Sequence, residues 1–206
     1  MPNPKRLKAI LAKFIKPQHA AAAEPAGFTL IELMVAMAVA SIMLAAVVGL
    51  FTTLNKSYTR QNVAANIQQV ARAGVDFMAQ SIRMAGLDPD QTGDFRITAA
   101  TETSITFRAD LDLDGSVAGT GETISYFLNG QDLMSNLNPT VPLVENVTDL
   151  TFTYLAADDS ILAAPVADPA AIRTVQIALT VEEPAGRGGT VTRTYATEVR
   201  CRNLGI

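Results

Sequence analysis

Residues 28–50 read FTLIELMVAMAVASIMLAAVVGL, a run of 23 residues in which Glu32 is the single charged side chain. About 20 helical residues, each rising 1.5 Å, are enough to cross the hydrocarbon core of a bilayer. The run is therefore long enough to be a transmembrane helix. The alternative, a buried core helix of a soluble protein, would be shorter and would lack the charge asymmetry described next.

Basic residues are concentrated on the N-terminal side of this run. Residues 1–27 carry a net charge of +4, whereas only Lys56 and Arg60 follow the run closely. Because basic residues are retained on the cytoplasmic side of a membrane, we expect the N-terminus in the cytoplasm and the rest of the chain outside.

The helical pattern continues beyond residue 50 without a stop signal. Apolar or small residues then recur every three or four positions, which predicts a helix with one apolar face: Val63, Ile67, Val70, Gly74, Phe77, Met78, Ile82 and Ala85. Gly86 followed by Asp88-Pro89 is typical of a helix C-terminus. We predict one continuous helix over residues 28–85.

The remainder of the chain shows the alternation of apolar and polar residues that is typical of strands. The predicted strands are residues 104–108, 123–128, 150–154, 174–181 and 190–199. Gly186 to Gly189 separate the last two, which favours an antiparallel hairpin. The Ala/Asp/Pro-rich residues 156–171 are predicted to form a surface loop. The expected fold class is α+β, a long N-terminal helix packed on an antiparallel β-sheet domain.

Several kinds of chemistry are disfavoured by composition. His19 is the only histidine and Cys201 the only cysteine among 206 residues, so neither an internal disulfide nor a His/Cys zinc site is available. A histidine-dependent nucleophile would need His19, which lies in the basic N-terminal segment. Only an enzyme built on carboxylates remains. Residues 87–206 carry a net charge of −10, which disfavours nucleic-acid binding by the bulk surface.

The junction over residues 27–36, GFTLIELMVA, resembles the type IV pilin superfamily, in which a basic leader ends in Gly and is followed by Phe-Thr-Leu-Ile-Glu. The resemblance implies that prepilin peptidase cleaves between Gly27 and Phe28 and methylates the amino group of Phe28. It implies a leader peptide over residues 1–27, a long helix over 28–85 whose residues 28–50 span the inner membrane and later form the filament core, and a β-rich periplasmic or extracellular domain over 86–206.

Glu32 then corresponds to the glutamate at position five of mature pilins. A carboxylate in an apolar helix costs about 2.5–3.5 kcal/mol on insertion scales, so it needs a partner. The amino group of Phe28 on a neighbouring subunit would neutralise this charge and set the axial stagger of the subunits. The alternative is that Glu32 extends to the cytoplasmic interface of the membrane and has no role in assembly.

Small residues at four-residue spacing in the same helix form two pairs, Ala36/Ala40 and Ala45/Gly49. Such pairs allow helices to pack closely in a filament core. Ordinary abundance of alanine in a membrane span explains them equally well.

Residues 77–86, 124–126, 144–147 and 150–154 are similar to PilW-type minor pilins. The resemblance implies a non-enzymatic, cofactor-free minor pilin that works with prepilin peptidase, other major and minor pilins, the inner membrane and the pilus assembly platform, and that finally resides in the pilus at the cell surface. Cys201 alone cannot close the C-terminal disulfide loop of many major pilins.

Three alternatives remain open. J-type pseudopilins of type II secretion systems share the same plan. A secreted, calcium-dependent binding domain would use Ala38-Val39-Ala40 as an ordinary signal cleavage site. A membrane-anchored enzyme is the third alternative, but it lacks a recognisable catalytic constellation.

The sequence D-x-D-x-D-G, formed by Asp110, Asp112, Asp114 and Gly115, resembles the start of a calcium loop. The acidic residue expected at the twelfth position falls on Gly121, with Glu122 one position later, so this is not an EF-hand. A Gly/Asp-rich turn between two strands explains the run without metal. We therefore predict no metal site, and name Asp110, Asp112 and Asp114 as the only calcium candidates.

Overall fold

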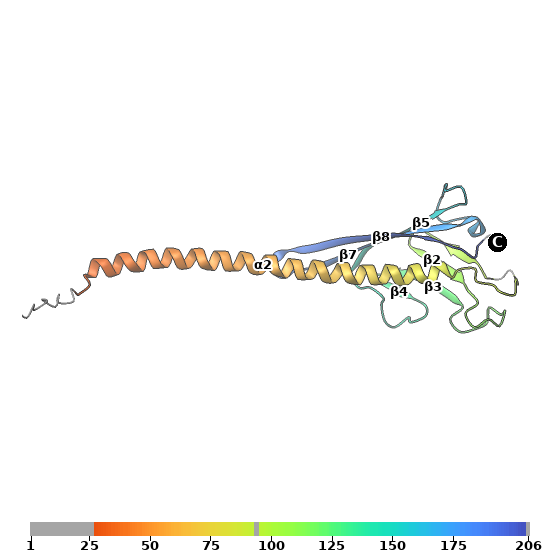
Figure 1. Ribbon diagram of the computed structural model, residues 1–206, viewed down its shortest axis with the longest axis horizontal. Coiled ribbons are helices and arrows are strands. Elements are labelled where there is room, and N and C mark those ends of the chain that lie inside the picture. Colours follow the sequence, from red (N-terminus) through yellow and green to blue (C-terminus); the bar gives the residue numbers. More distant parts are fainter. Residues whose placement is uncertain (1–26, 93–94, 205–206) are drawn as a thin grey trace, which may run out of the picture. The chain divides into compact units, whose positions relative to one another are not determined.

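The computed structural model describes residues 27–92 and 95–204 (Figure 1). The chain divides into two compact units, residues 1–49 and 50–206, which are considered separately below. Of the predicted leader, only Gly27 belongs to the described residues. His19 lies outside them.

A single helix, α2 (Leu30–Arg83), accounts for 54 residues of the chain. It is long and apolar enough to cross a membrane, and no residue in its most apolar stretch is buried. The helix ends in a turn at Gly86, whose φ of +79° is the left-handed conformation that glycine adopts readily. The Gly86 N–H donates to the Arg108 carbonyl oxygen at 3.0 Å.

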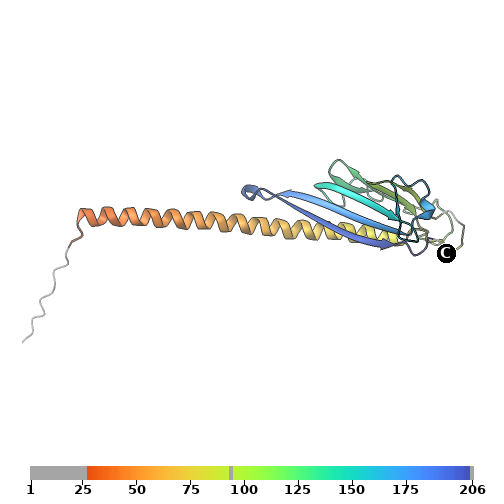
Figure 2. The ribbon, with the colours of Figure 1, turned by 90° about the horizontal axis from the view of Figure 1, so that it is seen from above.

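The strands form two four-stranded antiparallel sheets (Figure 2). The first has the order β1-β2-β3-β4, with β1 (Ile97–Ala100), β2 (Ser104–Arg108), β3 (Thr123–Asn129) and β4 (Asp132–Ser135). The second has the order β6-β5-β7-β8, with β5 (Val147–Leu155), β6 (Ile161–Leu162), β7 (Thr174–Pro184) and β8 (Thr190–Arg200). Two short 3₁₀ helices are η1 (Pro169–Ala171) and η2 (Gly186–Gly188).

All five predicted strands form, and the last two make the predicted hairpin. Strands β7 and β8 pair in register from Thr174↔Arg200 to Pro184↔Thr190. Gly186 and Gly189 supply positive φ angles of 57° and 85° at the turn between them. The residues 156–171, predicted to form a surface loop, are exposed or half-buried. They also contain the two-residue strand β6, which pairs with the end of β5, and the short helix η1.

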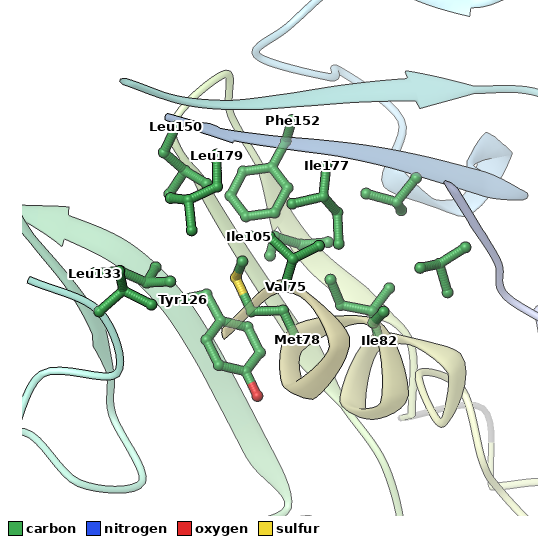
Figure 3. Close-up of a cluster of buried hydrophobic side chains, with 14 of the residues drawn as sticks. Val75, Met78, Ile82, Ile105, Tyr126, Leu133, Leu150, Phe152, Ile177 and Leu179 are labelled. Atoms are coloured by element: carbon green, nitrogen blue, oxygen red, sulfur yellow. The ribbon is translucent and has the colours of Figure 1, made fainter. Parts of the chain in front are cut away.

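The core of the unit formed by residues 50–206 lies between the second half of α2 and both sheets. Figure 3 shows Val75, Met78 and Ile82 of α2 among side chains from the two sheets, including Tyr126 and Ile177. Alternate residues of β2 and β3, and of most of β5 and β7, are buried in this core, as the pleat of a half-buried strand requires. The predicted α+β arrangement, a long N-terminal helix packed on antiparallel sheets, is confirmed.

The buried helix face agrees with the prediction in part, because Ile67, Met78 and Ile82 of the predicted face are buried and two other predicted residues are not. Val70 and Phe77 remain 37% and 45% exposed, whereas Ala71 and Val75 are fully buried. The predicted residues Val63, Val70 and Phe77 repeat every seven positions, and such a repeat drifts by about 20° per heptad around a straight helix. The buried face is centred on Ile67, Ala71, Val75, Met78 and Ile82. At 3.6 residues per turn, Val70 and Phe77 lie about 100° and 120° around the helix axis from the middle of this face.

Candidate functional site

The N-terminus of α2 is closed by a reciprocal pair of side chains. The Thr29 N–H and the Thr29 hydroxyl donate to Oε2 of Glu32 at 3.0 and 2.8 Å, and the Glu32 N–H donates to Oγ1 of Thr29 at 3.3 Å. This is a capping box, in which two otherwise unpaired backbone N–H groups at a helix start are satisfied. The sequence carries the signal for this cap, which is the pattern T-x-x-E over residues 29–32 before an apolar run.

The peptide bond between Gly27 and Phe28 lies just before this cap, outside any helix or strand. The Phe28 side chain is 92% exposed, and a Cβ atom placed on Gly27 would meet no other atom within 4 Å. Both residues that flank the bond are thus exposed.

Glu32, Ala36 and Ala40 share one face of α2. A shallow apolar hollow on this face is lined by Ile31, Glu32, Val35, Ala36, Val39, Ala40 and Met43. Ala45 and Gly49 do not line it, because 13 residues of helix separate Ala45 from Glu32 by about 220° around the axis. The two predicted small-residue pairs thus lie on different faces of the helix.

The three predicted calcium candidates lie together in the loop between β2 and β3, and the structure adds Glu122 to them. One carboxylate oxygen from each of Asp110, Asp112, Asp114 and Glu122 lies within 4.8 Å of all the others. Asp110 and Glu122 are 0% and 1% exposed, while the other two are exposed. Glu122 was not among the predicted candidates, because it follows the twelfth position of an EF-hand loop that starts at Asp110 by one residue.

Backbone N–H groups satisfy part of this cluster. Asp110 Oδ1 accepts from the N–H of Leu113 at 2.7 Å and of Asp114 at 3.2 Å, and Oδ2 accepts from Gly115 at 3.2 Å. These are the contacts of a tight Asp-rich turn, as the metal-free interpretation predicts.

The Glu122 carboxylate accepts fewer hydrogen bonds than the Asp110 carboxylate. Its Oε2 accepts from the Gly119 N–H at 2.9 Å, but its buried Oε1 has no hydrogen-bond partner among the described residues. Burial raises the pKa of Glu122 above its ordinary value, the Gly119 N–H opposes this, and the negative charges of Asp112 and Asp114 raise the pKa further. This carboxylate is therefore destabilised by its surroundings.

Cys201 is not a candidate nucleophile. The thiol is buried, and burial raises its pKa to about 11, although the positive charge of Arg173 opposes the shift. A thiol with this pKa stays protonated near neutral pH, whereas the thiolate is the nucleophilic form.

Comparison with known families identifies the N-terminal segment. The prokaryotic N-terminal methylation motif matches residues 25–48, which include the Gly27–Phe28 bond, the capping box and the apolar hollow. A comparison with curated proteins finds no significant match. The motif points to a structural protein rather than an enzyme, and the one long apolar helix found among the described residues fits a single-pass membrane anchor. Together these features support a type IV pilin-like or pseudopilin protein that is processed by prepilin peptidase.

Proposed function

We propose that this protein is a PilW-like minor pilin, a structural and assembly component of a type IV pilus. The observation that carries the proposal is the methylation motif at residues 25–48. Most of this segment belongs to α2, and no residue in the most apolar stretch of α2 is buried. An apolar helix of this length needs a bilayer or other helices around it. The helix of a pilin has both environments in succession, since it lies in the membrane before assembly and among other helices in the filament core afterwards.

In the proposed pathway the chain is inserted as a prepilin, with its basic N-terminus in the cytoplasm and residues 86–206 in the periplasm. Prepilin peptidase cleaves between Gly27 and Phe28 and methylates Phe28. The exposed, non-helical bond at this position supports such cleavage. The processed subunit then joins other major and minor pilins on the assembly platform.

Glu32 is proposed to direct assembly by binding the amino group of Phe28 on a neighbouring subunit. Both side-chain contacts with Thr29 use Oε2 of Glu32. Since a carboxylate has about four acceptor sites, the capping box and an incoming ammonium group are compatible. The hollow beside Glu32, with Ala36 and Ala40 in its wall, supports a close approach of the second helix. Ala45 and Gly49 are proposed to serve a second neighbour on another face.

The experiment that tests the proposal is mass spectrometry of the N-terminal peptide of protein purified from its native envelope. We expect the chain to start at N-methylated Phe28. The same protein from cells without prepilin peptidase serves as the control and should keep residues 1–27. A start at Ser41 would show that an ordinary signal peptidase removes half of the apolar run, and the proposal would be wrong.

A J-type pseudopilin of a type II secretion system would give the same N-terminus. Deletion of the gene separates the two functions. A minor pilin is required for surface pili, whereas a pseudopilin is required for release of secreted enzymes.

A further inference from the structure

We propose that the loop between β2 and β3 binds a calcium ion through the carboxylates of Asp110, Asp112, Asp114 and Glu122. The site is separate from the methylation motif and does not depend on the proposed role in a pilus.

The distances suit a single ion. Calcium binds oxygen ligands at 2.3–2.6 Å, so two oxygens on the same ion are separated by at most about 5 Å. The four carboxylate oxygens lie within 4.8 Å of one another and meet this condition without rearrangement of the loop. Two of the ligands are held in place, because Asp110 accepts three backbone N–H groups and Glu122 accepts one.

Glu122 shows that the turn alone does not account for the cluster. Its Oε1 atom is buried without a hydrogen-bond partner among the described residues, and its side chain faces the negative charges of Asp112 and Asp114. An unpaired buried oxygen and repulsion between like charges both destabilise the folded state. A bound cation would remove both penalties, whereas the Gly119 N–H contacts only Oε2 of Glu122.

The ligand chemistry favours calcium over other cations. The cluster offers only carboxylate oxygens, which are hard ligands, and it contains neither the nitrogen nor the sulfur ligands that zinc prefers. Calcium accepts six to eight oxygen ligands in flexible geometry, which suits an irregular 13-residue loop, whereas magnesium demands near-ideal octahedral geometry.

The test uses the full chain in detergent, stripped with EDTA and then titrated with calcium chloride by isothermal titration calorimetry. We expect one saturable site per chain. At a calcium concentration of about ten times Kd, we expect the Tm to rise by about 3–6 °C over its value in EDTA. Magnesium chloride at the same concentration should give a clearly smaller rise.

Two variants make the test specific. Glu122→Gln keeps the size of the side chain and removes its charge, and Asp112→Asn does the same at an exposed position where folding is not at risk. Each should weaken calcium binding at least about tenfold. In EDTA, Glu122→Gln should melt at or above the temperature of the wild type, because the repulsion from Asp112 and Asp114 is reduced. Glu145→Gln and Asp159→Asn, at exposed positions outside the cluster, are the matched controls and should bind calcium normally.

Three outcomes would overturn the proposal. The first is an unchanged Tm and no saturable heat when calcium is added to the wild type. The second is calcium binding by Asp112→Asn and Glu122→Gln that equals that of the wild type, since the ion would then lie elsewhere. The third is a magnesium effect as large as that of calcium, which would contradict the assignment to calcium.

Discussion

At the scale of single residues, Glu32 has one role within its own chain and a second, proposed role between chains. The capping box with Thr29 stabilises the start of α2, and the carboxylate charge is proposed to bind the amino group of a neighbouring subunit. The two roles make different demands on the side chain. A cap needs a hydrogen-bond acceptor, whereas a bond to an ammonium group in a water-poor filament core needs a negative charge.

We therefore expect Glu32→Gln to accumulate in the membrane as folded protein but to be absent from pili. Thr29→Ala removes a cap interaction, costs about 1 kcal/mol of helix stability and should still be incorporated. Immunoblots of sheared pili and of envelope fractions measure both results. If the Glu32→Gln variant were present in pili at the wild-type level, the proposed role of the Glu32 charge would be contradicted.

Cys201 makes stability depend on pH. Its thiol has an ordinary pKa of 9.0, and burial raises this pKa to about 11 in the folded protein. Between these values the unfolded chain has released the proton and the folded chain still holds it, so stability falls as pH rises. We expect the free energy of unfolding to fall by about 1 kcal/mol between pH 8 and pH 10 from this group.

Chemical denaturation in detergent at the two pH values measures the effect, and Cys201→Ala is the control. The variant lacks the thiol and should show a smaller loss. An equal loss in both proteins would place the effect elsewhere, for example at Tyr154, whose pKa burial also raises.

At the scale of elements, a glycine in α2 allows the helix to pack closely against the sheet domain. Gly74 is buried in the helix, and a Cβ atom there would overlap Cγ2 of Val144, which lies between β4 and β5. Glycine inside a helix costs about 1 kcal/mol relative to alanine. Its presence is explained by the close approach of Val144.

Gly74→Ala should therefore lower stability, by about 1–3 kcal/mol, although alanine is the better helix former. The double variant Gly74→Ala/Val144→Ala provides the space and should recover part of the loss. Thermal melts of the three proteins measure this. A Tm for Gly74→Ala above that of the wild type would mean that Val144 moves aside without cost.

At the scale of the whole molecule, the unequal distribution of charge is expected to orient the chain in the membrane. Residues 1–27 carry a net charge of +4 and residues 87–206 a net charge of −10. Basic residues are the effective signal, because they are retained on the cytoplasmic side.

A periplasm-dependent reporter fused after residue 206 should be active in the wild type. Its activity should drop several-fold when the basic residues of the leader are replaced by glutamine: Lys5, Arg6, Lys8, Lys13 and Lys16. Equal numbers of Gln substitutions at Arg residues of the 87–206 region control for the change in total charge. Unchanged activity with the neutral leader would show that another signal sets the orientation.

Much of this protein was predictable because its signals are local. The methylation motif is contiguous, the apolar run and the Gly86 stop define a helix from neighbouring residues, and five strands show alternation over at least five positions each. The short strands β1, β4 and β6 were not predicted, since two to four residues are too few to show a period. Their pairing depends on strands distant in sequence.

By itself the sequence determined the fold class, the long N-terminal helix and the segment that carries the processing signal, because each depends on residues that are close together in the chain. The tertiary structure alone decided the limits of the buried face of α2, because contacts with the two sheets determine how much of the helix surface is covered. Ile67, Met78 and Ile82 of the predicted face are buried, whereas Val70 and Phe77 lie at its edge and stay partly exposed. The tertiary structure alone brought Glu122 beside Asp110, Asp112 and Asp114, because the path of a loop, and not the count of residues in a motif, determines which carboxylates meet.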